Sequence, residues 1–206
     1  YSVVEDGETV NYYQYCTAFP IGTALAQTWD LDVMQEVCTA IGEEMQEYGV
    51  SIWLAPGMNL QRDPLCGRNY EYYSEDPYLT GMMGAAAVAG IQSTPGIGVT
   101  IKHYMGNNQE ASRNEENNTI NERTLRELYL KGFEIAVKQG KPMAIMTSYN
   151  LNNGVPAADD YDLCTDICRG EWGFDGFIMT DWGGGQSTPI YSMHAGNDII
   201  MPGGNP

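Results

Sequence analysis

The sequence predicts an α/β fold with parallel strands, the architecture of open α/β sheets and β/α barrels. One observation is that helical and strand patterns alternate five times along the chain. Another is that the expected strands are short apolar runs, as in sheets buried on both faces. The 206 residues suit one domain with a sizeable core, but a complete β/α barrel takes about 250. We therefore expect one domain over residues 1–206 that is incomplete at both ends.

Capping residues mark where the helices begin. An Asp or Asn side chain accepts hydrogen bonds from the first free amides of a helix, and proline suits the first helical position. Asp30, Asp76 and Asn121 are the predicted caps, while Gly49 and Gly140 are expected to end two of the helices. In chain order, we expect a helix 31–48, a strand 50–54, a helix 77–91, a strand 99–101, a helix 122–139, a strand 143–146, a helix 160–169, a strand 177–179, a short helix near residue 190 and a strand 198–201.

Composition excludes several classes of function. The formal net charge of −17, from 27 acidic and 10 basic residues, would repel a phosphate backbone, so we expect no nucleic-acid partner. No apolar run approaches the roughly 20 residues of a membrane span, and no signal peptide is visible. The five cysteines follow no disulfide or metal spacing, which favours core thiols and a cytoplasmic location. The two histidines lie far apart, and we expect neither a metal site nor a cofactor.

Polar and aromatic side chains follow successive predicted strands. Asp181 stands just beyond the end of the apolar run 177–179 and is followed by Trp182. Parallel α/β folds place their chemistry at the carboxyl ends of strands. Each residue alone also has a structural interpretation, since aspartates often cap turns and lysines often lie on surfaces. The other candidates in these loops are Lys102 and His103 after the strand 99–101, Arg113 further along the same loop, and Tyr149 after the strand 143–146.

The loop 55–76 is too long for a simple connection, and loops of this length are usually functional or disordered. Tyr70, Tyr72 and Tyr73 favour an ordered loop, and Arg68 gives it a cation. Cations, amides, a phenol and an indole around one carboxylate suit an uncharged polyhydroxy ligand with an aromatic platform for its apolar face. The chain thus predicts a carbohydrate site at the strand ends.

Five motifs in this order resemble the β-glucosidases of glycoside hydrolase family 3. The resemblance covers the chain from about Phe19 onward, and residues 195–203 resemble the last barrel strand of the family. The motifs are Gly67–Pro77, Ile101–Tyr104, Asn107–Glu110, Met146–Asn150 and Met179–Trp182. The resemblance implies a (β/α)8 TIM-barrel-like domain, incomplete or irregular at its N-terminal strands.

The resemblance also implies a role for each matching residue. Asp181 matches the nucleophile of a retaining enzyme, whose carboxylate attacks the anomeric carbon before water releases the sugar. Lys102 and His103 are expected to hold hydroxyls as charged donors. The complete sugar-binding set implied is Arg68, Lys102, His103 and Arg113 for the hydroxyls, with Met146, Tyr149 and Trp182 as walls. The substrate implied is a terminal, non-reducing β-D-glucosyl residue of a glucoside or oligosaccharide.

Departures from the family pattern leave alternatives open. The Asp-Gly-Pro-like motif of the first barrel segment is missing, and residues 1–17 match nothing in the family. The general acid of these enzymes lies in a following α/β-sandwich domain, which we expect to dock onto this one. Relatives acting on β-N-acetylglucosaminides carry a second histidine after the Lys-His pair, and here Lys102-His103 is followed by Tyr104-Met105-Gly106. A β-xylosidase and a non-catalytic carbohydrate-binding barrel are further alternatives.

Overall fold

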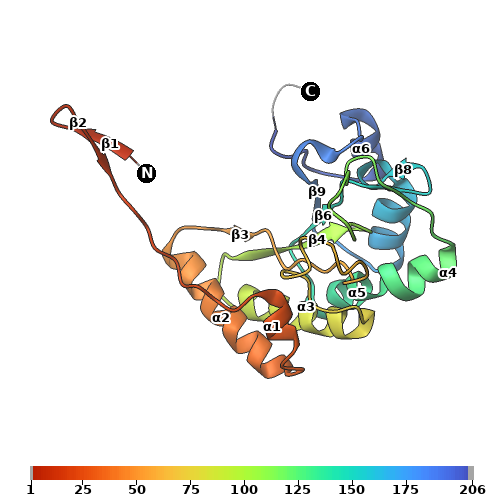
Figure 1. Ribbon diagram of the computed structural model, residues 1–206, viewed down its shortest axis with the longest axis horizontal. Helices are drawn as coiled ribbons and strands as arrows, with labels where there is room; N and C mark the ends of the chain where they lie inside the picture. The colour runs from red at the N-terminus through yellow and green to blue at the C-terminus, as the bar shows by residue number, and fades with distance from the viewer. Residues whose placement is uncertain (1, 204–206) are drawn as a thin grey trace.

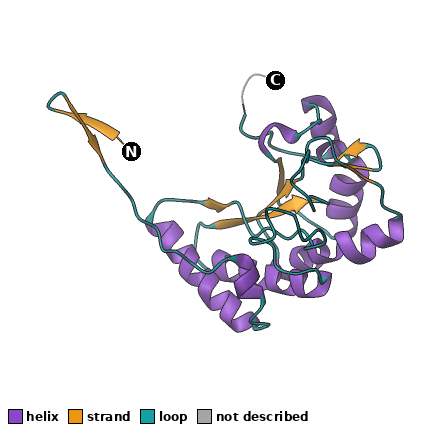
Figure 2. Ribbon diagram, viewed as in Figure 1, coloured by secondary structure: helices purple, strands orange, loops and turns teal. Residues whose placement is uncertain are grey.

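The computed structural model describes residues 2–203, in which helices and strands alternate along most of the chain (Figure 2). The strands are β1 (Ser2–Glu5), β2 (Glu8–Asn11), β3 (Ile52–Trp53), β4 (Gly98–Tyr104), β5 (Asn117–Asn118), β6 (Ala144–Thr147), β7 (Leu151–Asn152), β8 (Val155–Pro156) and β9 (Phe177–Thr180). The helices are α1 (Gly22–Ala26), α2 (Leu31–Glu47), α3 (Pro77–Gln92), α4 (Glu122–Thr124), α5 (Lys131–Ile135) and α6 (Pro189–Ala195). Irregular helical segments are η1 (Leu125–Tyr129), η2 (Ala136–Gly140), η3 (Ala157–Asp159), η4 (Asp162–Glu171) and η5 (Trp182–Gly184).

The centre of the fold is a parallel sheet with the strand order β3-β4-β6-β9. Ile101, Ile145 and Ile178 form one row across its three long strands, and all three are fully buried. The predicted α/β fold with parallel strands is thus confirmed. The predicted (β/α)8 barrel is not confirmed, because within residues 2–203 the sheet is open, with β3 and β9 as its edges. A β/α barrel closes only when eight tilted strands return to the first.

The predicted helix caps are confirmed. The Asp30 side chain accepts hydrogen bonds from two amides at the start of α2, while Asp76 and Asn121 each cap one amide of α3 and α4. Gly49, with φ of 69°, follows α2 in the left-handed conformation expected where a helix ends. None of the helices described between residues 2 and 203 has the length and apolar character needed to cross a membrane.

Helix α3 packs against α2 on one side and against α5 and η2 on the other. Glycines allow this close approach, since a Cβ on Gly81 would lie only 2.7 Å from the Cβ of Ile135. The role predicted for Gly140 is wrong in part. The left-handed residue that ends this helix is Lys141, with φ of 55°. Gly140 instead lets η2 approach α3, because a Cβ there would lie 3.0 Å from the Cα of Ala85.

Two of the expected strands are shorter than predicted. Strand β3 covers only residues 52–53 of the expected 50–54. The expected strand 198–201 joins the sheet through a single parallel bridge between Met179 and Ile199. The amide of Thr180 donates to the carbonyl of Ile199 at 3.0 Å, which keeps this segment beside β9.

A second, small sheet forms from the loops that follow β4 and β6. Its strand order is β5-β7-β8, and β7 and β8 are joined by the turn Asn153-Gly154. Both turn residues have positive φ, 50° and 90°, as a tight two-residue hairpin requires. This sheet holds the two long loops together on the side of the molecule where β4 and β6 end.

The first strands, β1 and β2, form an antiparallel hairpin that projects away from the rest of the molecule (Figure 1). Val4 in the hairpin and Tyr13 in the segment that follows it are both exposed. The hairpin is a separate two-stranded sheet that does not pair with β3, β4, β6 or β9. It therefore contributes nothing to the sheet that positions the strand ends.

Candidate active site

The candidate residues lie at the carboxyl end of the parallel sheet. Lys102 on β4 pairs with Met146 on β6, which in turn pairs with Met179 on β9. Paired residues of neighbouring strands project from the same face of a sheet. Asp181 follows Met179 by two residues, which is one full side-chain period along an extended strand. The register therefore brings Lys102 and Met146 to the side on which Asp181 leaves β9.

Asp181 is buried and contacts two neighbours through different oxygens. Its Oδ1 accepts a hydrogen bond from the backbone amide of Trp182 at 2.7 Å. Its Oδ2 lies 3.6 Å from Nε2 of His103. Burial together with the charge of Asp181 raises the pKa of the Tyr149 phenol to about 12. The carboxylate is thus held from β9 itself and from β4, and its charge acts on the loop after β6.

His103 lies at the centre of a buried polar network. Its Nδ1 is 3.1 Å from Oδ1 of Asn59 and 3.4 Å from the hydroxyl of Tyr72. Burial, followed by the positive charges of Arg68, Lys102 and Arg113, holds the pKa of the imidazole well below its usual value. A ring with so low a pKa is neutral near pH 7, which favours a neutral imidazole over the expected charged donor.

Glu71 connects two of the predicted cations. One carboxylate oxygen accepts from Nε of Arg68, and the other lies 3.7 Å from Nζ of Lys102. Burial lowers the pKa of Lys102, and the charge of Glu71 opposes this effect. Burial also acts to lower the pKa of Arg68, but the hydrogen bond to Glu71 and the charges of Tyr72, Glu71 and Glu110 together outweigh it, so the pKa is raised. We call Arg68, Glu71, Lys102, His103 and Asp181 the strand-end cluster.

Arg113 approaches the cluster from the loop after β4. Its guanidinium lies over the ring of Tyr149, 4.6 Å from the ring centroid, and donates to Glu110 at 2.7 Å. Glu110 also accepts from the amide of Asn107 at 2.9 Å. Arg113 and Tyr149, which lie 36 positions apart by sequence number, are thereby held together beside Asp181.

Comparison with known proteins decides the family. The model of the glycosyl hydrolase family 3 N-terminal domain matches residues 3–203, so the expectation that residues 1–17 match nothing in the family is wrong. The chain belongs to this family. Beta-glucosidase B of Emericella nidulans is 46% identical over 185 residues, which are 90% of this chain and 22% of the relative. An exo-alpha-(1->6)-L-arabinopyranosidase of Bifidobacterium longum is 43% identical over 186 residues, again 90% of this chain and 24% of the relative.

Solved structures support the same family 3 assignment. Beta-glucosidase 3B of Thermotoga neapolitana, in complex with alpha-D-glucose, superposes with a TM-score of 0.88 and 50% identity over 91% of this chain and 26% of that one. The beta-glucosidase of Kluyveromyces marxianus, in complex with glucose, also gives 0.88, with 41% identity over 91% of this chain and 22% of that one. The family 3 domain described here thus spans about a quarter of the length of these relatives.

The structure brings most of the predicted residues together. Trp182 is 44% exposed and touches Asp181 through its backbone, while Met146 is buried beneath the face it shares with Lys102. Sequence reasoning missed Asn59, Tyr72 and the pairing role of Glu71. Asn59 follows a strand end and a proline-glycine turn, a position like those of the other candidates, and this was the available signal.

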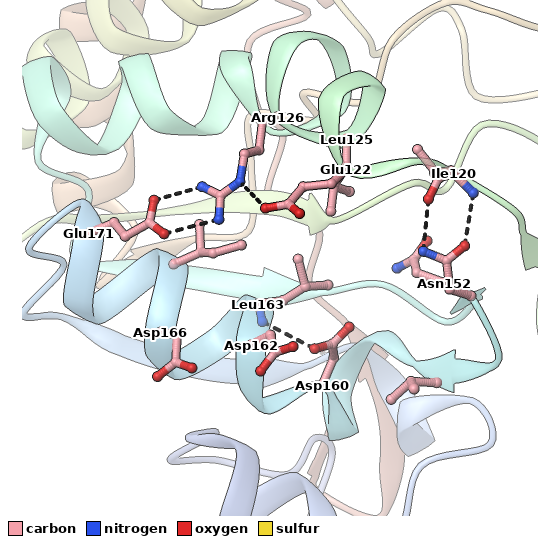
Figure 3. A pocket seen from close by; sticks show the side chains of 13 residues that line it. Ile120, Glu122, Leu125, Arg126, Asn152, Asp160, Asp162, Leu163, Asp166 and Glu171 are labelled. Carbon is pink, nitrogen blue, oxygen red and sulfur yellow. Dashed lines mark hydrogen bonds and ion pairs between the residues drawn. The ribbon is translucent and has the colours of Figure 1, made fainter.

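A separate cavity of about 510 Å³ lies between α4, η1 and η4 (Figure 3). Arg126 at its wall donates to Glu122 and Glu171, and Asp162 and Asp166 are also exposed there. We call this the Arg126 cavity. It contains none of the predicted site residues. Within residues 2–203, no three His, Cys, Asp or Glu side chains are grouped in a way that could hold a metal ion.

Proposed function

We propose that this family 3 domain supplies the nucleophile and the sugar-binding residues of a retaining, exo-acting β-glucosidase. The observation that carries the proposal is the placement of Asp181, a buried carboxylate at a strand end with His103 3.6 Å from one oxygen. Its other oxygen is fixed by the Trp182 amide. A nucleophilic carboxylate attacks in its ionised form. The charge of Asp181 acts on the ammonium of Lys102 on the neighbouring strand, so the two groups attract each other.

Each neighbouring side chain has a role in this proposal. Arg68, Lys102 and Arg113 donate to hydroxyls of the terminal sugar, since charged donors bind uncharged hydroxyls strongly in a buried site. The half-exposed indole of Trp182 offers a stacking face, and Met146 and Tyr149 form walls. Attack by Asp181 on the anomeric carbon breaks the bond to the leaving oxygen, which takes a proton from a general acid. Water then attacks the glycosyl-enzyme, and the sugar leaves with its original configuration.

The general acid in this proposal comes from a domain outside the chain. Retaining enzymes need two carboxyls about 5–5.5 Å apart. Glu71 and Glu110, the glutamates paired with cations of the site, already accept hydrogen bonds from Arg68 and from Arg113, respectively. The relatives are about four times longer than this chain, which leaves room for an α/β-sandwich domain carrying the acid. We further propose that the open sheet is part of a (β/α)8 barrel.

The preferred sugar is proposed to be β-D-glucose. The support is that two relatives at 41% to 50% identity were solved with glucose and are named beta-glucosidases. An L-arabinopyranosyl residue is a second candidate for the sugar. The arabinopyranosidase of Bifidobacterium longum is 43% identical to this chain, which makes it as similar as several of the glucosidases. A β-xyloside differs from a glucoside only in lacking the hydroxymethyl group, and it serves as a further comparison substrate.

The test uses the chain and a longer protein that carries it. The longer protein should hydrolyse cellobiose and release β-glucose first, which NMR of the fresh product would show. The folded chain alone should leave cellobiose intact and react only slowly with a dinitrophenyl β-glucoside, whose leaving group needs little protonation. General acid catalysis typically contributes about 10²- to 10⁴-fold to the rate. We therefore expect the chain alone to react with the dinitrophenyl β-glucoside faster than with cellobiose by about this factor.

Each outcome separates the alternatives. No hydrolysis of any aryl glycoside by the longer protein, together with glucose binding, would favour the non-catalytic carbohydrate-binding barrel. Faster cleavage of aryl α-L-arabinopyranosides or β-xylosides than of glucosides would replace glucose as the substrate. Efficient cellobiose hydrolysis by the chain alone would place a general acid within it, with Glu71, Glu75 and Glu110 the first residues to replace.

A further inference from the structure

The side-chain amide of Asn59 is oriented by the backbone of His103. Its Oδ1 accepts from the backbone amide of His103 at 3.0 Å, and its Nδ2 donates to the carbonyl of the same residue at 2.9 Å. A backbone N–H can only donate and a carbonyl can only accept. The two bonds therefore fix which end of the Asn59 amide is oxygen and which is nitrogen, without reference to the imidazole.

This orientation determines which nitrogen of the neutral His103 ring carries the hydrogen. The same Oδ1 of Asn59 lies 3.1 Å from Nδ1 of His103, and an amide oxygen can only accept. The hydroxyl of Tyr72 lies further from Nδ1, at 3.4 Å, accepts a hydrogen bond from the side-chain amide of Asn107, and has a second lone pair that can accept from Nδ1. Nδ1 must therefore carry a hydrogen, because otherwise two acceptors would face each other at 3.1 Å.

The other ring nitrogen is left without a proton. The charged groups that face His103 are Arg68, Lys102 and Arg113 on the positive side and Asp181 on the negative side. Burial and the three cations keep the ring neutral. A neutral ring protonated at Nδ1 presents a lone pair at Nε2, which lies 3.6 Å from Oδ2 of Asp181. Two acceptors this close need a donor between or beside them.

We propose that Asn59 is a positioning residue that holds His103 as the neutral Nδ1–H tautomer, so that Nε2 accepts a hydrogen bond from a hydroxyl of the substrate sugar. The part concerning the sugar rests on the proposed function, whereas the tautomer does not. Lys102 and Arg68 donate to hydroxyls, and His103 takes the opposite role. A site with donors and an acceptor side by side discriminates a hydroxyl from a group that only accepts, since the hydroxyl can do both.

The tautomer is tested by ¹⁵N NMR of the chain labelled at histidine. The chain contains only two histidines, and a His194→Gln background removes the signals of the exposed one. At neutral pH the expected spectrum of His103 has a protonated, pyrrole-type Nδ1 and an unprotonated, pyridine-type Nε2. The reverse assignment, or an imidazolium with both nitrogens protonated, would overturn the proposal.

Two substitutions test whether Asn59 is responsible. In Asn59→Ala the Nδ1 hydrogen loses its acceptor, so the two tautomers should mix. The ¹⁵N chemical shifts of both ring nitrogens should then move toward each other. In Asn59→Asp, which keeps the shape, the added negative charge should raise the pH at which the ring titrates. Asn197→Ala is the matched control, because Asn197 is equally buried and donates to the carbonyl of Ala158 at 2.7 Å without contacting His103. Unchanged His103 spectra in both Asn59 variants would contradict the proposal, and the isosteric Asn59→Asp covers the case in which Asn59→Ala fails to fold.

The sugar part is tested by glucose titration and by the pH profile of the longer protein. Removing a group that orients a metal-binding imidazole typically costs about 10- to 100-fold, and we use this range as the guide for His103. We expect a loss of this size in glucose affinity and in kcat/KM for Asn59→Asp, with the acidic limb of the profile moved to higher pH. Asn197→Ala should change neither. If NMR gives the Nδ1–H tautomer but glucose binds neither protein, the proposed function fails and the tautomer stands.

Discussion

The strand-end cluster and the Arg126 cavity contain the same kinds of charged side chain in opposite surroundings. In the cluster, the side chains of His103 and Asp181 are 2% and 12% exposed, and those of Arg68 and Glu71 are 19% and 22% exposed. In the Arg126 cavity, Arg126 and Glu171 are 40% and 49% exposed. The geometry is better in the cavity, where Arg126 binds both oxygens of Glu171 at 2.7 and 3.0 Å.

The difference shows that close pairing does not identify a site. Exposed pairs exchange contacts with water at little cost, so the Arg126 pairs serve mainly to order a surface. In the cluster the charges have lost water, and each must be satisfied by a fixed neighbour or by a ligand. Burial is the largest cause of the lowered pKa of His103 and of Lys102, whereas at Arg126 the hydrogen bonds to Glu171 and Glu122 are the largest causes and raise the pKa. Burial separates a site from a charged surface.

The largest difference between the two regions is expected on substitution of Asp181. Asp181→Asn in the longer protein should lower kcat/KM by several orders of magnitude, because an amide cannot act as the nucleophile. Asp162→Asn in the Arg126 cavity makes the same chemical change at an exposed position and should leave kcat/KM unchanged. Labelling with a 2-fluoroglucoside and peptide mapping provide the check, and an adduct on any residue other than Asp181 would refute the assignment.

A smaller effect is expected at the cations. Lys102→Ala should cost on the order of 2–4 kcal/mol in transition-state binding, because sugar hydroxyls would lose a buried charged donor. Lys138→Ala is the matched control, since Lys138 pairs with Glu134 at 2.8 Å on the surface. The measurement is kcat/KM for an aryl glucoside. A change of less than about threefold for Lys102→Ala would mean that Lys102 does not hold a sugar hydroxyl.

Local sequence patterns predicted the parts of the fold that depend on local physics. Helix caps such as Asp30 and Asp76 act within one turn, and both are confirmed. The end of β9 was also predictable, because charge follows its apolar run at Asp181, just beyond the last residue of the strand. The predicted end of the strand 99–101 is wrong, since β4 continues through Lys102 to Tyr104, yet the register still brings Lys102 to the carboxyl end of the sheet near Asp181.

Features that depend on distant contacts could not be predicted in this way. The Asn59 amide is defined by its bonds to His103, 44 positions away, and nothing local to Asn59 requires them. Gly140 was expected to end a helix because glycine is common there, yet its role comes from the close approach of Ala85 on another helix. Barrel closure likewise depends on strands pairing at long range, and the described residues form an open sheet.

Glu116 shows the effect of burial on a carboxyl group that has no proposed role in catalysis. Burial, followed by the charges of Glu110 and Asp63, raises the pKa of Glu116 to about 7. Its pKa is thus higher when folded than when unfolded, near 4.5, so the unfolded state loses its proton first as pH rises. Stability should fall between pH 4.5 and 7 on account of this group.

Glu116→Gln removes that dependence. The variant should match the parent near pH 4 and be more stable by about 1 kcal/mol at pH 8, an estimate reduced for partial exposure to solvent. Glu115→Gln makes the same change at the exposed neighbour and should give no such pH dependence. Urea unfolding at both pH values is the measurement. An equal gain at pH 4 and pH 8 would mean that the effect does not come from the raised pKa of Glu116.

The smallest effect is expected in the Arg126 cavity. Arg126→Ala breaks the contacts to Glu122 and Glu171 together, yet all three side chains reach water and can be hydrated instead. The melting temperature should therefore fall by no more than about 3 °C, and kcat/KM should not change. Most of this loss should disappear in 1 M salt, where the Debye length is about 3 Å. Arg68→Ala is the matched change in the strand-end cluster, and it should lower kcat/KM at every salt concentration because Arg68 is largely shielded from solvent. A loss of activity in Arg126→Ala as large as that in Arg68→Ala would show that the cavity belongs to the site, and that burial is not what distinguishes the two regions.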